Sequence, residues 1–236
     1  MYIVKVSALL TVVCASLVSL TSSMEMCMLE FDVVVLLDAS SSNEQFQLCK
    51  LFAGQIALSL DDRIEHSQVA VMQINGENRL EFGLDNEFST EELAIAFSSL
   101  RQRSGPHDGL SALQTVNNEV FGKMGDRPTV KNVILYVSAS KSQSDIAQIA
   151  DFIRLSGKGS IKVIAIGLEE DEDAMEQMED LAGSEEAVYS IAALTQPSEQ
   201  EIDRMTKWFC DQAKTSMDED DEDDDGGDGD DDDYEE

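Results

Sequence analysis

Basic residues are scarce in this chain of 236 residues. It contains 16 lysines and arginines against 48 aspartates and glutamates, which gives a formal net charge of -32. Nucleic acid is itself densely negative, so a chain with this balance is a poor partner for it. The acidity is strongest from Asp218 to Glu236, where 15 of 19 residues are acidic. We therefore expect no nucleic-acid partner.

Histidines and catalytic motifs are also scarce. His66 and His107 are the two histidines, and neither belongs to a Gly-x-Ser-x-Gly sequence. The sequence has no glycine-rich loop of the phosphate-binding type. His107 and Asp108 have the residue types of a base and its orienting partner, but adjacent residues rarely hold that geometry. These absences argue against an enzyme.

Long apolar runs are confined to the start of the chain. The run Val6–Leu20 follows Lys5 and precedes small polar residues, which is typical of a secretory signal peptide over residues 1–23. A membrane anchor, the alternative, requires about 20 apolar residues, and no second candidate span follows. We expect cleavage near Ser23 and no membrane attachment afterwards.

Cysteine is limited to four residues. Cys14 leaves with the leader, so Cys27, Cys49 and Cys210 remain in a compartment where disulfides persist. A bridge between Cys27 and Cys210 would tie the two ends of the domain together. Cys49 lies on an apolar stripe at helical spacing, formed by Phe46, Cys49, Ala53, Ile56 and Leu60. We favour a free buried thiol at Cys49 over an intermolecular bridge.

The remainder of the chain alternates short apolar runs with helical patterns. Runs typical of buried strands are Phe31–Leu37, Val69–Ile74, Val133–Val137 and Ile161–Ile166. Helices are predicted over Asn43–Leu60, Thr90–Leu100, Leu110–Phe121, Ser144–Leu155, Asp173–Leu181 and Ser198–Ala213. The turn sequence Asn75–Asn78 indicates a hairpin and one antiparallel edge strand.

This alternation predicts an α/β fold with a doubly wound, mostly parallel sheet and helices on both faces. We assign residues 24–30 to a linker containing Cys27 and residues 31–213 to one domain. Residues 214–236 are expected to form a disordered acidic tail, because like charges repel and little can be buried. Ligands of such sheets bind beyond the carboxyl ends of the strands, which is where Asp38–Ser42 is placed.

The sequence Asp38-Ala39-Ser40-Ser41-Ser42 resembles the Asp-x-Ser-x-Ser motif of the metal-ion-dependent adhesion site in von Willebrand factor A domains. The segments SQVAVMQI, NVILYVSAS and KVIAIGLEE follow in the order of that family's strands. The resemblance covers roughly Phe31 to Ala213 and implies a Rossmann-like fold without catalytic activity. Cys27 and Cys210 are similar in position to cysteines that flank A domains of matrilins and type VI collagen, which implies that they are bridged.

The resemblance also implies a metal, for which oxygen ligands from Asp38, Ser40 and Ser42 suit Mg²⁺ or Ca²⁺. His107 stands where the family has a threonine, and Ala139 stands where it has an aspartate. Imidazole suits zinc or copper better than hard cations. We therefore expect weak binding of Mg²⁺ or Ca²⁺, or none.

Substitute ligands are available near this site in the sequence: Asp108, and a hydroxyl of Ser138 or Ser140. The competing interpretation is that the motif is kept as a capped turn, in which its oxygens satisfy free N–H groups of the following helix.

Two functions remain open. The first is a secreted matrix or adhesion module that binds matrix or cell-surface proteins through a face containing Ser41, His107, Ala139 and Ser140. The second is an acidic protein associated with calcium or calcium mineral, in which the domain is a scaffold. Its tail would bind Ca²⁺ at low affinity or contact a cationic partner, and the simplest alternative for the tail is solubility alone.

Overall fold

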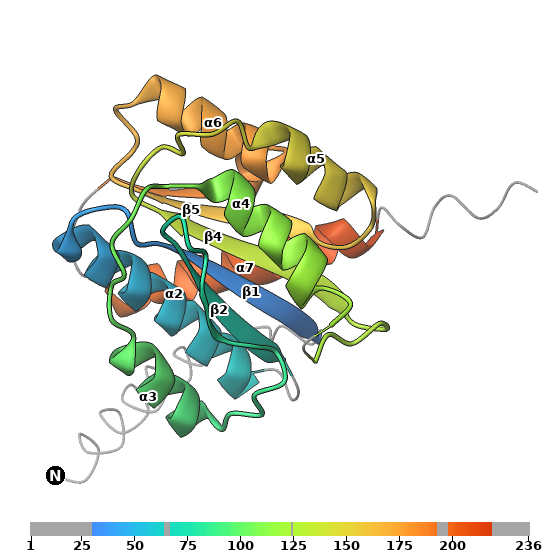
Figure 1. Ribbon diagram of the computed structural model, residues 1–236. Coiled ribbons are helices and arrows are strands. Elements are labelled where there is room, and N and C mark those ends of the chain that lie inside the picture. The colour runs from blue at the N-terminus through green and yellow to red at the C-terminus, as the bar shows by residue number, and fades with distance from the viewer. Residues whose placement is uncertain (1–29, 64–66, 124, 193–197, 219–236) are drawn as a thin grey trace, which may run out of the picture.

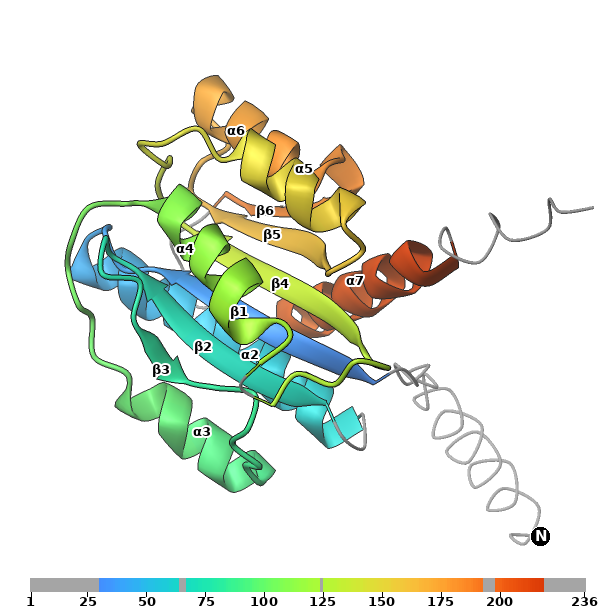
Figure 2. The same ribbon diagram turned by 45° about the vertical axis from the view of Figure 1, so that its right-hand side comes forward.

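Six strands form one twisted sheet in the computed structural model, which describes residues 30–63, 67–123, 125–192 and 198–218 (Figure 1). The strands are β1 (Phe31–Asp38), β2 (Gln68–Ile74), β3 (Leu80–Phe82), β4 (Lys131–Ser138), β5 (Ser160–Ile166) and β6 (Val188–Ile191). Their order is β3-β2-β1-β4-β5-β6, and every pair is parallel except β2 and β3 (Figure 2). The predicted fold class is confirmed, with β1 in the interior of the sheet.

Helices cover both faces of the sheet. They are α2 (Asn43–Arg63), α3 (Thr90–Ser99), α4 (Gly109–Thr115), α5 (Ala147–Leu155), α6 (Glu172–Ala182) and α7 (Glu199–Asp218). Helices α2, α3 and α7 lie on one face, and α4, α5 and α6 lie on the other (Figure 1). A π-helical turn (Val116–Val120) extends α4, and a 3-10 turn (Glu185–Ala187) precedes β6.

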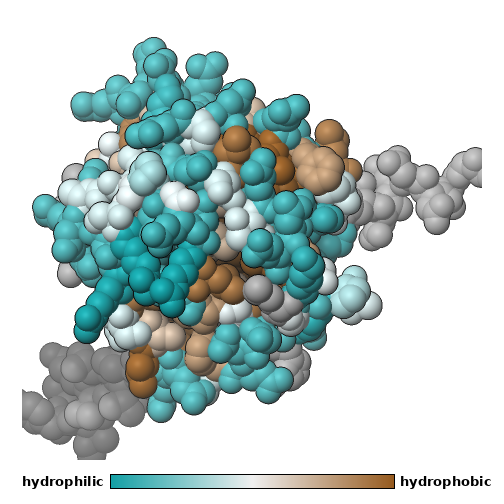
Figure 3. Space-filling model, in the orientation of Figure 1, coloured by the Kyte–Doolittle hydropathy of each residue, from teal (hydrophilic) through white to brown (hydrophobic). Residues whose placement is uncertain are grey.

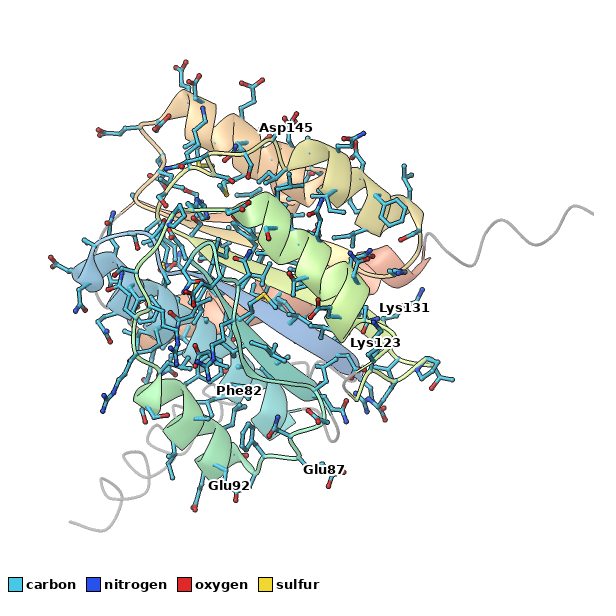
Figure 4. The ribbon with its side chains drawn as sticks, in the orientation of Figure 1. Phe82, Glu87, Glu92, Lys123, Lys131 and Asp145 are labelled. Atoms are coloured by element: carbon cyan, nitrogen blue, oxygen red, sulfur yellow. The ribbon has the colours of Figure 1, made fainter. Side chains whose placement is uncertain are left out.

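Strand β1 is buried along its whole length because helices cover it from both sides. Its side chains alternate between two cores, so Val33 and Val35 pack with α2 and α7 while Val34 and Leu36 pack with α4 and α5. This double coverage explains why the strand appears in the sequence as a continuous apolar run. The edge strand β3 is different, because its Phe82 is only partly buried and lies beside α3 (Figure 4).

Some elements differ from the sequence expectations. Strand β6 was not predicted, because it is short and only its last residue, Ile191, is buried. The pattern predicted as one helix ending at Phe121 is divided between α4 and the π-helical turn. Helix α5 begins at Ala147 rather than Ser144, and the Ser144 hydroxyl hydrogen-bonds to Asp108.

Helix α7 continues to Asp218, beyond the predicted domain end at Ala213. The acidic run begins only at Asp218, so the preceding residues carry no charge repulsion that would end the helix earlier. The leader (1–23), most of the linker (24–30) and residues 219–236 lie outside the described residues. Within the described part, no helix is long and apolar enough to cross a membrane.

The cysteines follow two patterns. Cys49 is a free thiol with no exposed surface, as predicted from its stripe. Cys210 takes part in a disulfide bond. Its predicted partner, Cys27, lies outside the described residues, so the Cys27–Cys210 pairing stays a prediction.

We expect the Cys49 thiol to be unreactive until the domain unfolds. Burial raises its pKa above the ordinary range, and the nearby charge of Asp38 adds to that effect. Because the thiolate is the reactive form, a maleimide at neutral pH should leave Cys49 unmodified in the folded chain and label it in denaturant. Mass spectrometry after a timed pulse measures this, and rapid labelling without denaturant would contradict it.

Candidate functional site

The carboxylate of Asp38 is the centre of a buried polar cluster. Its Oδ1 accepts hydrogen bonds from the Ser40 amide at 2.9 Å and the Ser40 hydroxyl at 2.6 Å. Its Oδ2 accepts from the Ser140 hydroxyl at 2.6 Å and the Ala139 amide at 3.2 Å. The Ser138 hydroxyl lies 3.2 Å from Oδ2 and 2.7 Å from the Ser140 carbonyl oxygen. Both carboxylate oxygens are therefore satisfied by neighbouring protein groups.

The topology of the sheet brings these residues together. Asp38 ends β1 and Ser138 ends β4, and the two strands are parallel neighbours in which Leu37 pairs with Val137. The next residues therefore leave the sheet side by side, although about a hundred residues separate them in the chain. Because β2 lies on the other side of β1, the winding reverses at this place, where doubly wound sheets bind ligands.

A glutamine that sequence reasoning missed fixes the backbone of this loop. The Gln102 side-chain amide donates to the carbonyl oxygens of Ala39 at 3.1 Å and Ser41 at 2.7 Å. Gln102 lies in the irregular segment between α3 and α4, where a single polar residue carries no recognisable pattern. Only the tertiary structure reveals its role.

Ser42 caps helix α2. Its hydroxyl accepts a hydrogen bond from the Gln45 amide at 3.3 Å, and the Gln45 side chain accepts from the Ser42 amide at 3.1 Å. This reciprocal pair satisfies two free N–H groups at the start of the helix. Ser42 is exposed, and its contacts are those of a capped turn rather than of the Asp38 cluster.

His107 and Asp108 have structural contacts of their own. His107 is 2% exposed, and its Nε2 lies 3.0 Å from the Tyr136 hydroxyl. Asp108 caps α4, where its Oδ1 accepts from the Ser111 amide at 3.1 Å and the Ser144 hydroxyl at 3.3 Å. Within the described part of the chain, neither side chain hydrogen-bonds to Asp38.

The four residues of the predicted binding face differ in exposure. His107 and Ala139 are both buried, so their side chains cannot meet a partner directly. Ser41 and Ser140 are partly exposed, so binding through these two residues stays a prediction. Burial could not be foreseen for His107, since a loop histidine is more often solvated.

The cluster offers one carboxylate and a few serine hydroxyls as oxygen ligands for a hard divalent cation. Ca²⁺ takes six to eight oxygen ligands, whereas Mg²⁺ is usually held by one or two carboxylates and keeps several waters. Asp38 is the single carboxylate of the cluster, and the imidazole of His107 is bonded to Tyr136 instead. In the residues that the structure describes, no three His, Cys, Asp or Glu side chains are grouped so as to hold a metal.

Tyr136 is a fully buried phenol beneath this cluster. Burial raises its pKa above the ordinary value, and the charges of Asp38 and Asp108 raise it further. A tyrosine in the unfolded chain ionises near pH 10, whereas this one keeps its proton in the folded chain. Its stabilising contribution is therefore complete below about pH 10 and declines as the pH rises above it.

Replacing Tyr136 with phenylalanine tests this linkage. At pH 7 we expect a loss of about 1–3 kcal/mol in the free energy of unfolding, because His107 Nε2 loses its partner. Between about pH 10 and pH 11 the variant should lose less stability than the wild type, because the buried phenol is gone. Urea denaturation at each pH measures both effects.

Tyr189→Phe is the matched control. Partial burial and a hydrogen bond to Glu201 raise the pKa of Tyr189 to about 12. Its hydroxyl bonds to this glutamate and not to a buried histidine, so its removal leaves no histidine nitrogen without a partner. We expect a smaller loss at pH 7 for this variant. If the free energy of unfolding of Tyr136→Phe fell above pH 10 as steeply as that of the wild type, the buried phenol of Tyr136 would not be the cause of the alkaline decline.

Two relatives match the chain at 30% identity. It is 30% identical over 144 residues to matrilin-3 of Gallus gallus, which covers 58% of this chain and 31% of the relative. It is also 30% identical over 145 residues to von Willebrand factor A domain-containing protein 2 of Xenopus laevis, covering 60% of this chain and 18% of the relative. The chain thus spans less than a third of the length of these relatives.

Solved structures of proximal thread matrix protein 1 from the mussel byssus share the fold. One aligns with a TM-score of 0.65 at 20% identity, covering 80% of this chain and 49% of that chain. Another structure of the same mussel protein has zinc in its MIDAS motif, the metal-ion-dependent adhesion site. The family model of the von Willebrand factor type A domain matches residues 32–204. By this match and the sheet order described above, the chain belongs to the von Willebrand factor type A domain family.

Proposed function

We propose that the chain is a secreted, non-enzymatic adhesion protein of the extracellular matrix. The proposal rests on the edge of the sheet where β1 and β4 end, which we call the rim. Ser41 and Ser140 follow these two strands and lie at the place where the winding of the sheet reverses. The similarity to matrilin-3 supports the same setting. The hydrogen bonds of Asp38 hold this rim in one conformation, which lowers the entropy cost of binding a protein partner.

Binding through this rim is tested with the full chain on immobilised fibrillar collagen, fibronectin and laminin. Ser41→Arg, which leaves the Ser140–Asp38 hydrogen bond in place, should weaken the affinity for the bound protein at least about tenfold, or about 1.4 kcal/mol. The matched control is Thr129→Arg, at an exposed position near the opposite end of β4. Equal losses in both variants would refute the rim as the docking face.

We further propose that the Asp38 cluster works as a structural turn and does not require Mg²⁺ or Ca²⁺. Its support is the saturated carboxylate and the absence of a second acid in the cluster. Calorimetric titration with Mg²⁺, Ca²⁺ and Zn²⁺ should give the same isotherms for the wild type and Asp38→Asn. A nanomolar Mg²⁺ site that disappears in Asp38→Asn would overturn this assignment.

A second candidate function concerns the acidic tail. Fifteen acidic residues from Asp218 to Glu236 would bind Ca²⁺ with low affinity and high capacity, or adsorb to a calcium mineral, with the domain as a scaffold. Equilibrium dialysis against Ca²⁺ compares the full chain with a chain that lacks these residues. We expect the capacity to fall sharply in the shortened chain, and an unchanged capacity would eliminate the tail as the binder.

A further inference from the structure

Three exposed arginines gather at the β3 edge of this strongly acidic molecule. Arg79 follows the β2–β3 turn, and Arg101 and Arg103 follow α3. We call these three residues the arginine patch. Figure 3 shows a compact, strongly hydrophilic area on this side of the molecule. Three neighbouring arginines are unexpected in this chain, since its acidic residues outnumber its basic ones three to one.

One buried glutamine joins all three arginine segments. The Gln73 amide donates to the Arg79 carbonyl oxygen at 3.3 Å, and its side chain donates to the Arg101 carbonyl oxygen at 2.9 Å. The Gln73 side-chain oxygen accepts from the Arg103 amide at 2.9 Å. Asn75 adds a bond from its side chain to the Arg103 carbonyl oxygen at 2.8 Å. Gln73 has no exposed surface, so the patch is held by the core of the domain.

The patch retains positive charge after its internal contacts are counted. Arg103 forms an ion pair with Glu81 at 2.8 Å, and its side chain is still 42% exposed. Within the described residues, no side-chain partner is present for Arg79 or Arg101. Lys50 of α2 adds a fourth cation beside them, because its ammonium group donates to the Leu100 carbonyl oxygen at 3.3 Å. Positive charge therefore exceeds the negative charge of Glu81 and of Glu77 in the adjacent turn.

We propose that the arginine patch binds the acidic C-terminal segment, residues 219–236, of the same chain. This segment supplies the carboxylates that guanidinium groups bind best, and it is the densest negative charge in the sequence. Its 18 residues span up to about 60 Å when extended, which exceeds the diameter of about 40 Å expected of a domain of this size. A tethered segment acts at an effective concentration of about millimolar, which favours its own patch over another molecule's.

Binding of this kind depends on salt. Exposed charge pairs are largely screened once the Debye length falls below their separation, from about 10 Å at 0.1 M to about 3 Å at 1 M salt. The bound segment covers the β3 edge of the sheet at low ionic strength and leaves it at high ionic strength. The same contact shields an edge strand that would otherwise pair with other chains.

The experiment places a nitroxide spin label at Glu235→Cys in the isotope-labelled chain and records amide NMR intensities. The chain is prepared from residue 24, without Cys14, and Cys49 is buried, so with the predicted Cys27–Cys210 bridge intact the introduced thiol is the accessible one. At about 20 mM salt we expect the amides of residues 77–80 and 100–104 to lose about half of their intensity or more, and to recover at about 500 mM. Arg79→Gln combined with Arg101→Gln should abolish the loss and leave the Arg103–Glu81 pair in place.

Lys123→Gln combined with Lys207→Gln is the matched control, because it makes the same change of net charge at exposed positions elsewhere. Lys123 lies beyond the end of α4, far across the view from the hydrophilic area (Figures 3 and 4). This variant should keep the local broadening. Equal broadening in both double variants, or no local broadening in the wild type at low salt, would overturn the proposal.

Two further outcomes would also overturn it. In the first, a spin-labelled chain without isotope is mixed with an isotope-labelled chain without a spin label. If the amides of the arginine patch broaden as strongly in this mixture as in the chain that carries both labels, the contact is with a second molecule. A heparin fragment that shifts the amides of the arginine patch, in a chain whose tail produces no broadening, would assign the patch to a sulfated polysaccharide.

Discussion

Arg127→Ala is expected to lower the free energy of unfolding by about 3–5 kcal/mol, the largest effect that we predict for an ion pair in this chain. Asp32, on β1, has no exposed surface and depends on this arginine. The Arg127 Nε and Nη2 atoms lie 2.9 and 2.6 Å from one carboxylate oxygen, and its backbone amide lies 2.9 Å from the other. Removing the guanidinium leaves the buried Asp32 carboxylate with one of its three hydrogen-bond donors, the backbone amide of residue 127.

Reversible urea denaturation at neutral pH measures this loss. Adding Asp32→Asn to Arg127→Ala should recover part of it, because the unpaired buried charge is then removed. Arg204→Ala is the control, since Arg204 is exposed and its pair with Glu201 should contribute within about 0.5 kcal/mol. A loss below about 1 kcal/mol for Arg127→Ala would show that Asp32 is satisfied in another way.

Phe31→Ala is expected to have an effect of similar size, about 3–5 kcal/mol. Phe31 begins β1 with no exposed surface, and its ring lies 6.3 Å from that of Phe209 at an angle of 86°. This edge-to-face pair connects the central strand with α7, so truncation leaves a cavity where the last helix packs on the sheet. Thermal and urea unfolding should both report the loss.

Phe152→Ala provides the matched control for this truncation. Phe152, on α5, is 52% exposed, so the same truncation creates no enclosed cavity. We expect a change below about 1 kcal/mol. Similar losses in the two variants would show that the Phe31–Phe209 contact does not stabilise the packing of α7.

The central part of the fold could be predicted because its residues obey local patterns. Phe31–Leu37 is continuous and β-branched because the strand is covered on both faces, and that pattern exists before any tertiary contact forms. Cys49 was placed correctly in the core because its apolar stripe repeats at helical spacing. Strand β6 lacks such a signal, since an edge strand with three partly exposed residues does not need continuous apolarity.

The candidate site was only partly predictable. The motif Asp38–Ser42 is visible as a sequence, but its residues divide into two roles, with Ser40 bonded to Asp38 and Ser42 capping α2. Long-range contacts that no local pattern encodes decided that His107 is buried against Tyr136 and that Gln102 fixes the loop backbone.

By itself, therefore, the sequence determined the fold class, the position of β1 and the acidity of the chain, because periodicity and charge are properties of short segments. Only the tertiary structure decided which distant polar groups meet. The parallel pairing of β1 and β4 brings Ser138 and Ser140 to Asp38, and the burial of Gln73 gathers three arginines at one edge. Both results depend on the register of packed strands, which forms when the chain closes contacts over about a hundred residues in one case and about thirty in the other.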